Sequence, residues 1–89
     1  MKDIQQIINQ IDHDLKKQGI NDTLKKTEKL MGQDPINFLK VEDKKLYKYR
    51  IKHVLIAMSH ATIEYWDNDF MNKNGPEIFQ PLLQILNSD

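Results

Sequence analysis

The 89-residue chain contains no cysteine and only three glycines and three prolines. Without cysteine it can form no disulfide, no thiolate zinc site and no thiol nucleophile. Its longest fully apolar run, residues 54–58, is far too short to span a membrane, and its first residues lack the uninterrupted apolar stretch of a secretory signal. We therefore expect an intracellular, cytoplasmic protein with no membrane span.

Apolar residues recur at spacings of three and four in two stretches, a period typical of a helix with one buried face. The first stretch predicts a helix over about residues 3–18, and the second predicts a long helix over about 43–66. Sustained alternation of apolar and polar residues, the pattern of a strand, is missing. The two predicted faces are Ile4, Ile7, Ile8, Ile11 and Leu15, and Tyr47, Ile51, Val54, Met58, Ala61 and Tyr65, the second flanked by Leu55, Ile56, Ile63 and Trp66.

Glycine, aspartate and proline mark the ends of the shorter elements. Gly19 is placed to end the first helix, with Ile20 making the apolar contact that follows such an end. Asn21 or Asp22 can cap a second, short helix that ends at Gly32, so the first two helices are expected to form a hairpin. The expected packing positions of the second helix are Leu24, Thr27, Leu30 and Met31.

Two further segments complete the expected fold. Asp34 and Pro35 predict a single helical turn whose apolar residues, Ile36, Phe38 and Leu39, plug one end of the core. Because Pro81 suits the first turn of a helix better than its interior, the last helix is expected to start near Gln80. The sequence thus predicts an all-α fold, a small antiparallel bundle of three to four main helices forming one domain over residues 1–89.

Groups that could perform catalysis or hold a metal are few. His60 and Glu64 lie one turn apart on a stripe with Arg50, His53 and Ala57, but this spacing is also that of an ordinary stabilising pair on a solvated face. The acidic turn 67–69 lacks the glycine and the final glutamate of a calcium loop. No phosphate-binding loop or nucleophile elbow is present. We expect no catalytic residue, no metal and no cofactor, and hence no enzyme.

Charge cancels over the whole chain but not locally. Residues 40–53 hold six basic and two acidic side chains, whereas residues 54–89 hold one basic and five acidic. The basic residues with interleaved tyrosines could contact phosphates and stack on bases, although the chain has only one arginine for base readout. This alternative nucleic-acid face, which solvation alone could equally explain, consists of Lys44, Lys45, Lys48, Arg50 and Lys52.

The C-terminal third carries more apolar side chains than one helix face needs. Either these side chains are core, or some of them form a surface for a protein partner or for a second copy of the chain. In a homodimer, residues 40–53 of one copy could face the acidic region 64–77 of the other. The candidate partner-binding residues are Trp66, Phe70, Met71, Phe79, Leu82 and Leu83.

The expected plan, a small helical bundle with a long third helix, is similar to that of bacteriocin immunity proteins, antitoxins and small phage-encoded inhibitors. The similarity is one of architecture and implies no site residue. Twelve lysines against one arginine, with eleven isoleucines and seven asparagines, fit AT-rich coding such as that of low-GC bacteria and their phages. The leading hypothesis is a non-catalytic protein-binding module, a regulator or inhibitor from a bacterium or phage. The alternative is a small nucleic-acid-binding protein, and a third hypothesis is an enzyme subunit whose activity depends on a partner chain.

Overall fold

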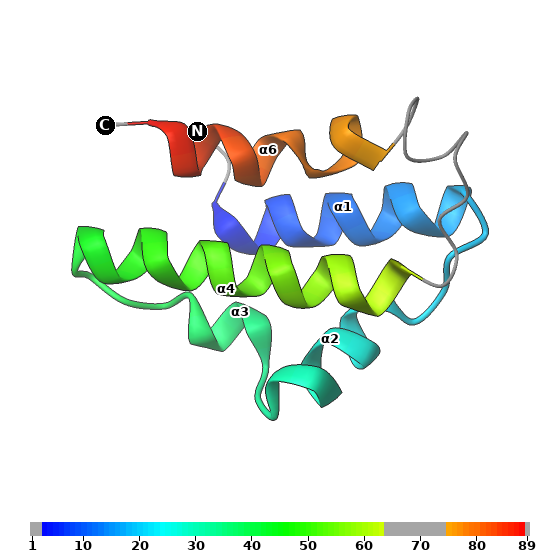
Figure 1. Cartoon of the computed structure of the whole chain (residues 1–89), viewed down its shortest axis with the longest axis horizontal. Coiled ribbons are helices and arrows are strands. Elements are labelled where there is room, and N and C mark those ends of the chain that lie inside the picture. The colour runs from blue at the N-terminus through cyan, green and yellow to red at the C-terminus, as the bar shows by residue number, and fades with distance from the viewer. Residues whose placement is uncertain (1–2, 64–74, 89) are drawn as a thin grey trace.

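The computed structural model describes residues 3–63 and 75–88, and the five elements within these ranges are all helices, which confirms the all-α prediction. Figure 1 shows α1, α4 and α6 lying lengthwise beside one another, with α6 antiparallel to the other two, and α2 and α3 crossing along one side of α4. Their bounds are α1 Ile4–Lys17, α2 Thr23–Met31, α3 Pro35–Phe38, α4 Lys44–Thr62 and α6 Gly75–Asn87.

The core lies between the three long helices, and each of them contributes three buried side chains to it. Tyr47, at the start of the expected α4 stripe, is only partly buried against this core, and Tyr65 lies outside the described residues. The periodicity therefore identified the packing faces of α1 and α4. The core residues are Ile8, Ile11 and Leu15 of α1, Ile51, Val54 and Met58 of α4, Ile78, Phe79 and Leu82 of α6, and Ile20 and Leu39 between helices.

Both ends of α1 are capped, and the glycine at its C-terminal end is the one that the sequence predicts. Asp3 caps its N-terminus by accepting the Gln6 N–H at 2.8 Å, and the Gln6 side chain accepts the Asp3 N–H in return. At the other end Gly19 adopts a φ of +87° and donates to the Lys16 carbonyl, while Ile20 donates to the Leu15 carbonyl at 2.9 Å. This pattern is a Schellman motif, and Ile20 is buried after it.

The second helix departs from the sequence prediction in two ways. Asp22 occupies the N-cap position of α2 but has a left-handed backbone, and its side chain accepts no capping hydrogen bond. In addition, α2 packs mainly on α4 and only weakly on α1, so the expected hairpin of the first two helices is wrong. Its buried residues are the small threonines Thr23 and Thr27, which allow close approach, whereas Leu30 is exposed.

Aspartates start the next two helices. Asp34 accepts the Ile36 N–H at 3.1 Å ahead of Pro35, and Asp43 accepts the Leu46 N–H at 2.8 Å at the start of α4. After the single turn of α3, Leu39 is buried and Ile36 and Phe38 pack against the core. The prediction of a turn that closes the core is thus confirmed.

The start of α6 corrects the sequence analysis. The helix begins at Gly75, five residues before the start expected near Gln80, and it carries Pro81 in its interior. An interior proline removes one backbone hydrogen bond and disfavours a helix. Helical register, however, places Ile78, Phe79 and Leu82 together in the core, and their burial offsets that cost.

Candidate functional site

Large apolar side chains stand exposed on α2 and α4, away from the core. Leu30 of α2 is 60% exposed, and Ile56 and Ile63, on and directly after α4, are 49% and 61% exposed. The helical spacing predicts that all three lie among the packed positions, and their exposure shows that this prediction is wrong. Exposed apolar side chains are ordinary when single, but a group of them marks a surface suited to binding.

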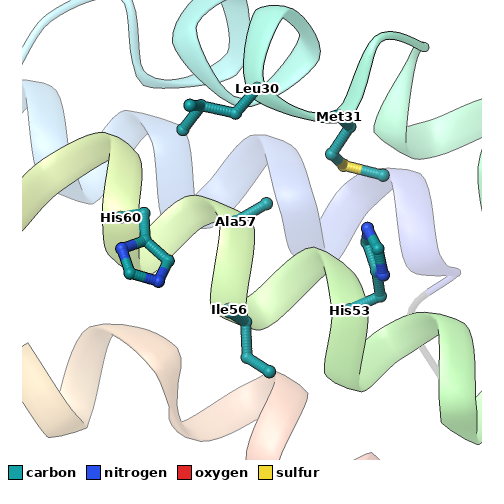
Figure 2. A pocket seen from close by; sticks show the side chains of 6 residues that line it. All are labelled: Leu30, Met31, His53, Ile56, Ala57 and His60. Carbon is teal, nitrogen blue, oxygen red and sulfur yellow. The ribbon is translucent and has the colours of Figure 1, made fainter.

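These three side chains border two adjoining hollows between α2 and α4. The first, of about 260 Å³, lies between Leu30 and Met31 of α2 and His53, Ile56, Ala57 and His60 of α4. Figure 2 shows Met31 and His53 reaching toward each other from the two helices. The second, of about 520 Å³, is lined by Lys26, Lys29, Leu30, His60, Ala61 and Ile63. Because Leu30 and His60 line both hollows, we treat them together as the α2–α4 groove.

Small residues of α4 create this groove. Ala57 and Ala61 are buried under α2 and line the two hollows. Because their side chains are short, α2 can lie close to the α4 backbone, and the space next to the contact is not filled. The sequence analysis placed Ala57 on a solvated stripe with His53 and His60. That expectation is wrong at Ala57, because α4 is covered on two sides, by the core and by α2.

The Arg50 side chain is engaged in contacts with Phe38 of the same chain. Its Nη1 donates a 2.8 Å hydrogen bond to the carbonyl oxygen of Phe38, and its guanidinium carbon lies 4.6 Å from the centre of the Phe38 ring. The same ring contacts His53, with the two ring centres 5.4 Å apart. Arg50 therefore fastens α3 to α4 by a hydrogen bond and a cation–π contact.

The other four residues of the sequence-based nucleic-acid face stay near the surface. Lys44, Lys45 and Lys52 are exposed, whereas Lys48 is partly buried and donates to the carbonyl oxygen of Ser88. Because Arg50 and Lys52 are two residues apart, their side chains point about 200° apart around the axis of α4. The structure thus brings the lysines to one side of α4 and separates the arginine from them.

The C-terminal candidates for partner binding divide into three groups. Phe79 and Leu82 are buried in the core, 4% and 0% exposed, and Leu83 is partly buried. Trp66, Phe70 and Met71 lie outside the described residues. The sequence signal that could have pointed to the α2–α4 groove instead is the pair Ile56 and Ile63, seven residues apart on the side of α4 away from the core stripe.

The described residues hold neither a cluster of metal ligands nor a membrane-spanning helix. Within residues 3–63 and 75–88, no three side chains of histidine, aspartate or glutamate are grouped so as to hold a metal ion. Glu64, the expected neighbour of His60, lies outside the described residues. In the part of the chain that the structure describes, no helix is both long enough and apolar enough to cross a membrane.

Comparison of the chain with protein-family models, with curated proteins and with solved structures gives no match.

Proposed function

We propose that the chain is a non-catalytic helical module that binds another protein through the α2–α4 groove. The observation that carries this proposal is the gathering of Leu30, Ile56 and Ile63, each about half exposed or more, around the two adjoining hollows of this groove. Protein interfaces have an apolar centre of this kind, surrounded by polar groups that shield it from water. Here Lys26 and Lys29 supply polar groups at the margin.

The module's biological role in this proposal is that of a regulator or inhibitor, as immunity proteins and antitoxins are. A protein that acts only by binding needs no catalytic groups, and a rigid surface reduces the entropy that it loses on binding. The support for rigidity is the arrangement around the groove, where buried threonines and alanines hold α2 against α4 and Arg50 fastens α3 beside them. A bacterial or phage origin belongs to the same proposal and rests on codon-biased composition alone.

Nucleic-acid binding is the second candidate, and one observation favours it. Tyr49 is 67% exposed and lies within about 60° of Lys45 and Lys52 around the α4 axis, an arrangement that could stack on a base between two phosphate contacts. Two members of the expected face are occupied inside the chain, however, Arg50 with Phe38 and Lys48 with Ser88. This leaves a smaller basic surface than the sequence suggests.

Capture from an extract of the cells that express the protein tests the proposal. Three immobilised forms are compared: the wild type, Leu30→Asp in the groove, and Tyr49→Asp, an exposed apolar residue outside both hollows. We expect a protein that the wild type and Tyr49→Asp retain and that Leu30→Asp loses, because a carboxylate in the apolar centre is desolvated without a partner. Circular dichroism checks that all three remain helical.

Two results would contradict protein binding at the groove. Equal retention by Leu30→Asp would show that the groove is not the contact surface. Retention that disappears on nuclease treatment and in Tyr49→Asp would assign the chain to nucleic acid instead.

A further inference from the structure

We propose that the segment bound in the α2–α4 groove is an acidic amphipathic helix of the partner protein, an inference that rests on the function proposed above. The groove runs along α4 from His53 to Ile63, which is about 15 Å at the rise of an α-helix. It is bordered by two helices, so a third helix can lie between them and bury one apolar stripe. About three turns of a partner helix match this length.

The charges around the groove select the polar residues of that helix. Among the described residues that line the two hollows, Lys26 and Lys29 are basic and none is an aspartate or glutamate. The whole of α4 has no acidic residue, and α2 has only Glu28, which does not line the groove. A partner helix with glutamates or aspartates beside its apolar stripe therefore meets complementary charge along the α2 margin of the groove, at Lys26 and Lys29.

Charge also argues against a second copy of the chain in the groove. A two-fold contact sets the same surface against itself, so Lys26 and Lys29 of one copy would approach the same lysines of the other. Like charges held close together in an interface are unfavourable. The α2 and α4 helices of the second copy together hold one acidic residue, Glu28, that could pair with these lysines.

The chemistry of the lining disfavours a nucleic acid at this place. Leu30, Ile56 and Ile63 present aliphatic carbon, which cannot bind phosphate. Of the residues that the structure describes, no phenylalanine, tyrosine or tryptophan lines either hollow. The exposed aromatic ring of α4, that of Tyr49, lies outside both hollows. A base-stacking surface and the groove are therefore separable by mutation.

Two synthetic peptides test the inference in a fluorescence-anisotropy titration. Both have about 15 residues with leucines at helical spacing, and their remaining positions are rich in glutamate in one peptide and in lysine in the other. We expect the wild type to bind the glutamate peptide at least about tenfold more tightly than the lysine peptide. Raising the salt concentration should narrow this difference, since the charges lie at the surface.

Variants locate the binding. Leu30→Ser should weaken binding of the glutamate peptide about tenfold through lost apolar contact, without loss of fold, because the side chain is mostly exposed. Lys29→Glu should reduce the preference for the glutamate peptide severalfold. The matched controls are Lys45→Glu, the same charge change on α4 away from both hollows, and Tyr49→Ser, both of which should leave peptide binding unchanged.

Several outcomes would overturn the inference. Tighter or equal binding of the lysine peptide would remove the charge argument. Loss of binding in Lys45→Glu and Tyr49→Ser, together with competition by a single-stranded DNA oligonucleotide, would favour nucleic acid. A wild-type dimer in analytical ultracentrifugation that Leu30→Ser converts to monomer would place a second copy in the groove.

The failure of this inference is distinguishable from that of the proposed function. If neither peptide binds, while capture of a cellular protein still depends on Leu30, the acidic helix is wrong and protein binding at the groove stands. If capture does not depend on Leu30, the proposed function itself fails.

Discussion

A buried hydroxyl in α2 allows the packing of the α2–α4 pair to be tested with one small substitution. Thr23 is fully buried at the start of α2, and its Oγ1 has no hydrogen-bond partner among the described residues. Leaving a buried hydroxyl unpaired costs about 1–3 kcal/mol. Valine has almost the same shape and lacks that hydroxyl, so we expect Thr23→Val to raise the free energy of unfolding by about 1 kcal/mol.

Thr27, one turn later and equally buried, supplies the matched control. Its Oγ1 donates a 2.8 Å hydrogen bond to the carbonyl oxygen of Thr23, so Thr27→Val removes a bond that is made. A lost hydrogen bond of this kind costs about 0.5–1.5 kcal/mol. The same substitution four residues apart should therefore change stability in opposite directions.

Urea unfolding followed by circular dichroism measures both variants at unchanged m-value. For a domain of this size, a change of about 1 kcal/mol shifts the Tm by about 4–8 °C. Thr23→Val should shift it upward and Thr27→Val downward. Equal destabilisation by both substitutions would refute the reasoning, because it would mean that the Thr23 hydroxyl is paired or that its pocket does not accept a methyl group.

Two further substitutions test contacts of α4. Arg50→Lys should lower the free energy of unfolding by about 1 kcal/mol in urea, since lysine keeps the charge but loses the planar group that bonds and stacks on Phe38; unchanged stability would contradict the fastening of α3. Desolvation by burial raises the pKa of Tyr47, so its contribution to stability should be fully present below about pH 10 and lost as the pH rises above that value. We expect the free energy of unfolding to fall less between neutral and alkaline pH in Tyr47→Phe than in the wild type or in Tyr49→Phe. An equal fall in all three proteins would contradict this role of the Tyr47 hydroxyl.

The sequence predicted the fold where a local signal and a long periodic pattern agreed. In α1, the spacing of the isoleucines and the glycine at position 19 indicate the same helix, and the structure confirms both. In α4, the spacing from Ile51 to Ala61 identifies the core face. These features depend only on residues close in the chain, and a single sequence is sufficient to reveal them.

Features that depend on distant residues were not predicted. The residues in and around α2 do not indicate whether it packs on α4 or on α1. The small residues that permit its contact with α4, Thr23, Thr27 and Ala57, give no periodic hydrophobic signal. The helical conformation around Pro81 likewise depends on burial of Phe79 and its neighbours against α1 and α4. Local proline chemistry alone indicated a later start.

The candidate site shows the same limit. An excess of apolar residues predicted a binding surface, but composition could not distinguish Leu82, which is in the core, from Ile63, which is exposed. The lysine-rich segment was visible in the sequence, whereas the engagement of Arg50 by Phe38, twelve residues away, was not. The groove itself exists only because α2 crosses α4.

The most direct test of the central claim maps the contact surface of the partner retained by the wild type. In ¹H–¹⁵N NMR spectra of the labelled chain, addition of that partner should shift the backbone amide signals of Leu30, His60 and Ile63 most strongly, and the signals of Lys45 and Tyr49 least. Shifts centred on Lys45, Tyr49 or α6, with none at Leu30, would contradict the assignment of the α2–α4 groove as the binding site.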